Sequence, residues 1–356
     1  MAAPSLLTRR SLAGMVAAAA LLIAGPAFAQ NGFPSFRNLV KQVQPAVVNI
    51  SVTEKVPETA GATPLPPGLK GTPFEKQFRD RFRSGPQVMG AGSGFIIDPS
   101  GVIVTNNHVV GQASSITVSL SDGTKLQAHV IGADQLTDIA VIKVDAPRPL
   151  PYVTWGNSDR VQVGDWVLVA GNPFGLGGSV TAGIVSARGR DIGAGPFDDF
   201  LQLDAPINPG NSGGPAFNMR GHVVGLNTAI VSPTGGSVGI GFAIPSRIVE
   251  KIVAQLRRGG RIARGWLGVS VQDLPGDAGG VAIDGVEPNS PAAAGGVKAG
   301  DVVMAVNGTR VNSSNGLIRA VAEVPPGRMA RLTIRRHGRQ IVLPVRVGQR
   351  PAETRG

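Results

Sequence analysis

Short apolar segments separated by turn residues run through the first two thirds of the chain. Ile116, Val118 and Leu120 alternate with polar residues, residues 121–124 form a turn sequence, and the alternation then resumes. This pattern predicts a β-hairpin. Further strands are expected at 47–53, 102–104, 138–144, 166–170, 180–186, 200–203, 215–218, 223–227 and 239–244. So many short strands without helices between them indicate a β-barrel or a β-sandwich.

One amphipathic helix follows these strands, and a linker at 258–264 comes after it. Ser246 is the expected N-cap, and Gly259 and Gly260 end the helix. The apolar face is expected to consist of Ile248, Ile252, Val253 and Leu256.

A second unit of mixed type is expected at 265–348, with a short tail at 349–356. Its pattern predicts a closing hairpin that turns at His337 and Gly338 and a helix near 317–324. Strands are expected at 266–271, 281–286 and 302–306. A small unit of strands with one such helix suits a peptide-binding module.

The N-terminus has the pattern of an export signal. Arg9 and Arg10 precede an uncharged run at 12–24, and Ala27-Phe28-Ala29 then supplies a small-x-small cleavage site. The run is shorter than the about 20 residues that span a bilayer. We therefore expect a signal peptide at 1–29 that is cleaved after Ala29, by the Sec or the twin-arginine route.

The amino-acid composition excludes several kinds of functional site. The chain has 356 residues, 42% of them hydrophobic and 16% charged, which is a globular balance, and it has no cysteine. Disulfides, thiolate nucleophiles and cysteine-bound zinc are thereby excluded. The formal net charge is +11, but no aromatic residues interleave the C-terminal arginines as a nucleic-acid platform would require. We expect a solvated basic face and no nucleic-acid partner.

A long Pro/Gly-rich loop is expected at 53–87. Within it Phe74, Phe78 and Phe82 recur every four residues, so a helix there would present an aromatic stripe. The stripe packs either on the same barrel or on a sister subunit, and the sequence leaves both open.

Ser212 is the candidate nucleophile. It lies in Gly210-Asn211-Ser212-Gly213-Gly214, where glycines let backbone N–H groups crowd a developing oxyanion. Gly210 and Ser212 are the expected donors.

The candidate base is His108, which directly follows an apolar strand. The other histidines lie in a strand or in turns, where structural or exposed roles are expected. Asp138 begins another apolar strand, where an ionised carboxylate is costly without a partner. Holding an imidazole N–H of His108 would relieve that cost.

The order His108, Asp138, Ser212, in the motifs TNNHVV, DIAVIKV and GNSGGP, resembles chymotrypsin-fold proteases and, closely, the HtrA (Do-like, DegP/DegQ) serine proteases. The resemblance covers nearly all of the mature chain. It includes RGWLGV at 264–269, which resembles the opening of the family's PDZ domain.

The resemblance implies a mostly β fold: an N-terminal segment at 30–46, a chymotrypsin-like double six-stranded β-barrel at 47–257, and an α+β PDZ domain. It implies a periplasmic serine endopeptidase of envelope protein quality control that needs no cofactor or metal and cleaves unfolded or misfolded proteins. It implies a substrate site at Ile207, Asn227, Thr228 and Ala229, a regulatory Arg190, and a PDZ site for peptide C-termini at Trp266, Leu267, Gly268 and Val269.

Assembly and the alternative function depend on the same resemblance. Phe33 and Phe36 match positions where family trimers pack aromatic rings, so a homotrimer or a multiple of it is expected; the alternative is that both are exposed residues of an N-terminal tail. A second PDZ domain is not expected, because the chain ends where relatives with two would continue. The alternative is a non-catalytic chaperone or PDZ adaptor, which would not need the complete set of His108, Asp138 and Ser212.

Overall fold

The computed structural model describes seven stretches of the chain. The expected signal peptide, Phe33 and the Phe74, Phe78 and Phe82 stripe lie outside the described residues. Within these stretches, no helix combines the length and the apolar character needed to cross a bilayer. The described residues are 35–53, 88–111, 113–172, 178–208, 210–232, 236–274 and 279–349.

The first barrel is closed, with strand order β1-β2-β3-β6-β5-β4. The β-branched runs of β1 and β6 fill its interior, where Ile50 and Ile142 are fully buried. Before it come α2 (Arg37–Val43) and η1 (Gln44–Ala46). Its elements are β1 (Val47–Thr53), β2 (Val88–Asp98), β3 (Val102–Thr105), α4 (Asn107–Val110), β4 (Ser115–Ser119), β5 (Lys125–Asp134) and β6 (Ile139–Val144).

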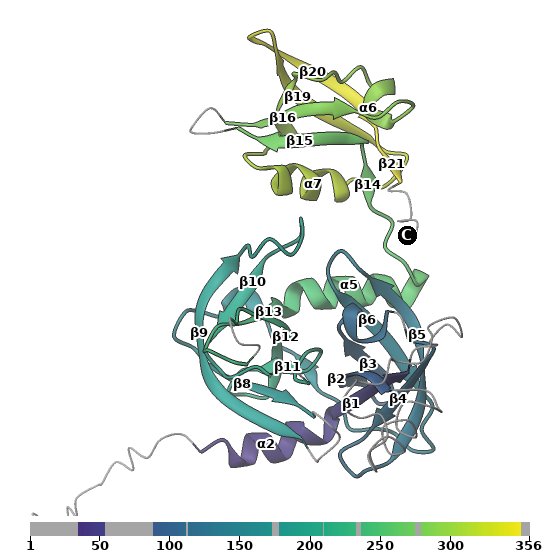
Figure 1. Cartoon of the computed structure of the whole chain (residues 1–356), viewed down its shortest axis with the longest axis vertical. Coiled ribbons are helices and arrows are strands. Elements are labelled where there is room, and N and C mark those ends of the chain that lie inside the picture. Colours follow the sequence, from purple (N-terminus) through teal and green to yellow (C-terminus); the bar gives the residue numbers. More distant parts are fainter. Residues whose placement is uncertain are drawn as a thin grey trace, which may run out of the picture. The chain divides into compact units, whose positions relative to one another are not determined.

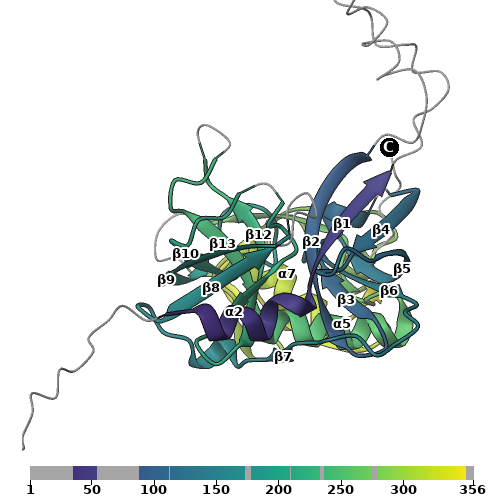
Figure 2. The same ribbon diagram turned by 90° about the horizontal axis from the view of Figure 1, so that it is seen from below.

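The second barrel lies beside the first in both views (Figures 1 and 2). Strands β8-β9-β10-β13-β12-β11 close on themselves because β11 pairs with both β8 and β12, and β7 adds to β12 outside this ring. The prediction of a mostly β, double six-stranded barrel is confirmed. The elements are β7 (Thr154–Trp155), η3 (Ser158–Arg160), β8 (Trp166–Gly171), β9 (Ser179–Arg190), β10 (Phe200–Leu203), β11 (Pro215–Phe217), β12 (His222–Ile230) and β13 (Gly241–Pro245).

Helix α5 (Ser246–Gly259) packs against strands of both barrels. The predicted N-cap role of Ser246 is wrong, because Ser246 is already helical and Pro245 occupies the cap position without a side-chain bond. The Ser246 hydroxyl instead donates to the Gly156 carbonyl at 2.6 Å and accepts the Ser158 N–H at 3.2 Å. At the other end Gly260 adopts a left-handed φ of 68° and closes the helix, as expected for a glycine C-cap.

Arg264 is the last residue of the predicted linker, and its side chain is buried. Its guanidinium forms a bidentate ion pair with the Asp134 carboxylate, and both side chains are buried. The guanidinium also lies over the Phe197 ring, 4.6 Å from its centre. A buried pair of this kind fixes the end of the linker on the first barrel.

The C-terminal unit contains an open sheet with strand order β15-β16-β17-β19-β20. The single strand predicted at 266–271 is wrong, because Gly268 turns the chain at a φ of 75° and divides it into β14 and β15. The predicted hairpin is confirmed, with His337 and Gly338 both at positive φ between β19 and β20. The elements are β14 (Gly265–Trp266), β15 (Val269–Asp273), β16 (Val281–Val286), α6 (Pro291–Ala294), β17 (Val302–Val306), β18 (Thr309–Arg310), α7 (Ser314–Ala322), β19 (Met329–Arg336), β20 (Arg339–Arg346) and β21 (Gly348–Gln349).

A buried carboxylate stabilises this unit. Asp301 is 1% exposed and accepts hydrogen bonds from Arg336 Nε at 2.6 Å, from Arg336 Nη2 at 2.7 Å and from the Lys298 N–H at 2.8 Å. Burial by itself raises the pKa of Asp301, but Arg336 and the Lys298 N–H outweigh it and hold the pKa below its usual value.

Replacement of Asp301 by Asn should destabilise the C-terminal unit by about 1.5–3 kcal/mol at pH 7, the range for hydrogen bonds to charged groups. A lowered folded-state pKa means that this stabilisation is complete above the ordinary Asp pKa of about 4 and is lost as pH falls through the folded-state pKa. Amide hydrogen exchange in β17 and β19 should therefore differ between wild type and Asp301→Asn at pH 7 and converge at low pH. Asp122→Asn, which removes an exposed carboxylate paired with Arg148, is the control and should change little. Equal effects of the two substitutions would contradict this assignment.

Candidate active site

Asp138 and His108 form the first half of the site. The His108 Nδ1 and Asp138 Oδ2 atoms lie 2.7 Å apart, and the His108 backbone N–H donates to Oδ1 at 2.9 Å. The Asp138 carbonyl accepts the Asn107 N–H at 3.1 Å and the Asn106 side-chain amide at 2.9 Å. Asp138 has a φ of 54°, an unusual conformation for a residue with a side chain. Its contacts with residues 106–108 hold it there. On the other side of the ring, His108 Nε2 has no hydrogen-bond partner in the described ranges.

Ser212 lies in a loop of the second barrel that contacts the first. The Ser93 N–H donates to the Ser212 carbonyl at 2.8 Å. Gly213, at a φ of 84°, packs so closely on the Ser93 carbonyl and the Thr105 hydroxyl that a Cβ atom would collide with both. Ser212 thus lies against the segment that leads into His108. Among the described residues, no hydrogen bond joins Ser212 Oγ to His108, and such bonds often tighten only when substrate binds.

Backbone N–H groups around Ser212 divide into two sets. Gly213 donates to the Asn227 carbonyl at 2.8 Å, and Gly214 donates to the Asn211 carbonyl at 2.9 Å. The N–H groups of Gly210 and Ser212 donate to no acceptor in the described part of the chain. Gly210 has a φ of 101°, which glycine adopts most readily. The two predicted oxyanion donors are therefore the two that remain available.

The predicted substrate residues lie on or near β12. Asn227 pairs through its backbone with Gly213 and Gly214, and the Thr228 hydroxyl accepts a hydrogen bond from Asn106 at 2.8 Å. Ala229 lies opposite Phe242 of β13. Ile207 is 2% exposed and packs against Gly241 in the core of the second barrel. Asn227, Thr228 and Ala229 thus run beside the nucleophile, while Ile207 lies beneath the surface.

Sequence reasoning missed the buried polar residues that join the two barrels. The Asn106 amide bridges the Asp138 carbonyl and the Thr228 hydroxyl, and Ser93 donates to the carbonyls of Gly210 and Ser212. Both are fully buried. The sequence signal was a polar residue within or directly after an apolar strand, since a buried polar group requires a hydrogen-bond partner.

Arg190 lies at the end of β9, outside this arrangement. Its guanidinium donates to the Gln202 side chain at 2.9 Å and is exposed. Its regulatory role stays a prediction.

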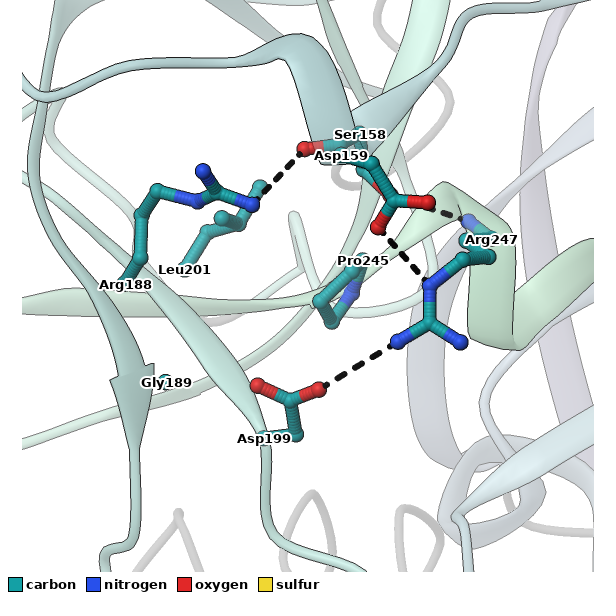
Figure 3. A pocket seen from close by; sticks show the side chains of 8 residues that line it. All are labelled: Ser158, Asp159, Arg188, Gly189, Asp199, Leu201, Pro245 and Arg247. Carbon is teal, nitrogen blue, oxygen red and sulfur yellow. Dashed lines mark hydrogen bonds and ion pairs between the residues drawn. The ribbon is translucent and has the colours of Figure 1, made fainter.

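A surface pocket near the start of α5 does not include the three predicted catalytic residues (Figure 3). Arg247 points toward Asp159 at 2.8 Å and Asp199 at 3.8 Å, and Arg188 points toward the Ser158 carbonyl. The two arginines of this pocket thus bind groups of the pocket itself: Arg247 pairs with both carboxylates, and Arg188 binds a backbone carbonyl.

The C-terminal unit offers a second candidate site beside β15. This strand is an edge of its sheet, and α7 lies alongside it (Figure 1). The carbonyls of Leu267 and Gly268 accept the N–H groups of Ala292 and Glu287, both at 2.9 Å. The N–H groups of Leu267 and Gly268 have no acceptor among the described residues. They are therefore available to bind an anion.

No cluster of three or more His, Asp or Glu side chains suited to a metal ion occurs in the described ranges.

Two closed six-stranded barrels followed by this small α+β unit are the architecture of a chymotrypsin-like serine endopeptidase with a second, smaller domain. A family model of the trypsin-like peptidase domain matches residues 92–226, and a model of the PDZ domain matches residues 265–347. A probable periplasmic serine endoprotease, DegP-like, of Brucella suis biovar 1 (strain 1330) is 46% identical over 353 residues, covering 89% of this chain and 69% of the relative. The chain belongs to the HtrA family of DegP-like serine endoproteases.

Other relatives agree. A DegP-like protein of Rhizobium meliloti (strain 1021), described in the same words, is 44% identical and covers 90% of this chain and 71% of the relative. The solved structure of the HtrA-type protease AlgW with decapeptide aligns with a TM-score of 0.76 at 37% identity, covering 90% of this chain and 100% of that one. A serine endoprotease from Yersinia pestis aligns with a TM-score of 0.70 at 34% identity, covering 90% of this chain and 99% of that one.

Proposed function

We propose that Ser212, His108 and Asp138 are the catalytic triad of this endopeptidase. The observation that supports this most strongly is the pair of N–H groups at Gly210 and Ser212, directly at the nucleophile, which donate to no acceptor among the described residues. His108 Nε2 takes the proton of Ser212 Oγ as that oxygen bonds to the peptide carbonyl carbon. The carbonyl π electrons move onto its oxygen, and the two N–H groups stabilise that charge.

Collapse of this intermediate breaks the C–N bond and releases the amine, which takes the proton from His108. Water, deprotonated by the same imidazole, then cleaves the acyl ester and restores Ser212. Asp138 holds the ring through Nδ1 throughout. We place the substrate strand along Asn227, Thr228 and Ala229, with Ile207 under a pocket for a small aliphatic residue before the cut.

The substrates we propose are unfolded or misfolded envelope proteins, and the PDZ domain binds peptide C-termini. Relatives that are named periplasmic support a periplasmic location. The regulatory role of Arg190 and the homotrimer stay predictions. A non-catalytic chaperone or adaptor needs no unused N–H pair beside a serine, so nothing in the site favours that alternative.

Ser212→Ala should reduce casein cleavage by roughly 10⁴- to 10⁶-fold, because nucleophilic attack is lost while the fold is kept. The assay compares unfolded casein turnover by the mature wild type, Ser212→Ala and the surface control Ser115→Ala. The control should cleave at the wild-type rate. A Ser212→Ala protein that keeps one tenth of wild-type activity would refute the triad.

The PDZ domain should bind a peptide with a free C-terminal carboxylate and an apolar last residue. The peptide adds a strand to β15, and the N–H groups of Leu267 and Gly268 hold its carboxylate. Amidation of the C-terminus should weaken binding by at least about 1.5 kcal/mol, the size of one charge-assisted bond. Calorimetry on the uncleaving Ser212→Ala protein measures this difference. Equal affinities for the acid and the amide would rule out carboxylate capture.

Export should remove residues 1–29, so that the mature protein begins at Gln30. N-terminal sequencing of envelope material tests the site. Ala29→Lys should block cleavage, because the peptidase accepts a small residue there. A wild-type N-terminus at Met1, or material that stays in the membrane after a carbonate wash, would show that the segment is not a cleaved signal.

A further inference from the structure

Ser93 is a buried residue of β2 that reaches from the first barrel into the nucleophile loop of the second, defined here as residues 210–214. It is 0% exposed. Its hydroxyl donates to the Gly210 carbonyl at 2.5 Å and accepts the Asn172 N–H at 2.8 Å. Its backbone N–H donates to the Ser212 carbonyl, and its carbonyl accepts the Thr105 hydroxyl at 2.7 Å. Ser93 therefore holds the nucleophile loop at two points, on either side of Asn211.

The peptide group between Gly210 and Asn211 is fixed at both ends. Ser93 binds its oxygen, and its N–H donates to the Asn208 carbonyl at 3.0 Å. Gly210 lacks a Cβ atom, so without these bonds this peptide group would rotate at little steric cost. Rotation would change the angle between the N–H groups of Gly210 and Ser212. The Ser93 hydroxyl is thus the contact from the first barrel that opposes this rotation.

Asn172 in turn fixes the Ser93 hydroxyl. Its carbonyl accepts the Asn49 side-chain amide at 2.9 Å, and its side-chain oxygen accepts the Gly178 N–H at 3.0 Å. An N–H that donates to a hydroxyl oxygen polarises the O–H bond and strengthens the bond that the hydroxyl donates. The bond from the Asn172 N–H to the Ser93 hydroxyl therefore strengthens the bond from that hydroxyl to the Gly210 carbonyl in the nucleophile loop.

We propose that Ser93 is a positioning residue for proteolysis, which keeps the Gly210 and Ser212 N–H groups directed at one oxygen. The inference rests on the proposed function, since it assigns to Ser93 the orientation of the proposed oxyanion donors. Ser93 does not touch substrate. Its loss should weaken binding of the transition state and leave binding of the ground state unchanged.

Ser93→Ala tests this in the mature, full-length protein with a fluorogenic peptide that has a small aliphatic residue before the cut. We expect kcat to fall roughly 10- to 100-fold, less than the 10²- to 10³-fold typical of losing an oxyanion donor itself, with KM unchanged. A boronic acid of the same peptide, which forms a tetrahedral adduct on Ser212, should bind more weakly by the same factor. The cleaved product peptide should bind as before. Hydrogen exchange at the Asn211 amide should accelerate.

Ser246→Ala is a matched control, because Ser246 is also fully buried and its hydroxyl also donates to a carbonyl and accepts an N–H. It should lose stability but keep kcat and boronate affinity. Similar losses in both variants, or a change in KM with boronate binding intact, would overturn the positioning role. If Ser93→Ala does not fold, Ser93→Cys, which keeps a weaker donor, carries the same comparison.

Ser212→Ala in the same assay separates the two proposals. If Ser212→Ala stays active, the triad is wrong whatever Ser93 does. If Ser212→Ala is inactive and folded Ser93→Ala matches wild type in kcat and boronate affinity, the triad stands and the inference on Ser93 is wrong.

Discussion

Buried hydrogen bonds between the two barrels are the interactions on which the rest of the site depends. Ser93 binds the carbonyls of Gly210 and Ser212, and Asn106 binds Thr228. These bonds join residues of the first barrel to residues of the second. Apolar burial stabilises each barrel, but it is non-directional and does not set a register between them. A buried polar group left without its partner costs about 1–3 kcal/mol. A displacement of one barrel against the other would break these bonds beside Ser212, so their cost opposes such a displacement.

Asp138 shows how local strain is stabilised at this junction. A left-handed conformation costs a residue with a side chain roughly 1–2 kcal/mol. Four hydrogen bonds from residues 106–108 reach its carbonyl and carboxylate, and each typically contributes about 0.5–3 kcal/mol. The bonds together outweigh the strain. The same bonds orient the carboxylate toward His108, so the contacts that permit the unusual backbone also build the acidic half of the site.

Local patterns in the sequence predicted most of the strands and the hairpin at His337 and Gly338, because period-two alternation and turn residues act over a few positions. The pattern failed where a single glycine or a distant partner decides the outcome. Gly268 interrupts a run that is apolar on both sides, and Ser246 forms hydrogen bonds about 90 residues away in place of a cap. Glycine spacing led to the prediction that Gly210 and Ser212 are the oxyanion donors, and their N–H groups have no acceptor among the described residues. Asn106 and Ser93 were missed because their roles depend on contacts between barrels, which no local pattern encodes.

The nucleophile loop and the turn before β15 share one backbone arrangement. Gly210 and Gly268 both have a positive φ and turn the chain. The Ser93 hydroxyl donates to the Gly210 carbonyl, and the Glu287 N–H donates to the Gly268 carbonyl. In each case the neighbouring N–H groups remain without a protein acceptor among the described residues. Fixing the carbonyl removes the freedom that glycine would otherwise give, so the N–H groups are directed before any ligand arrives. Preorganised donors avoid the cost of reorganisation when charge appears, which suits both the transient oxyanion proposed at Ser212 and the peptide carboxylate proposed beside β15.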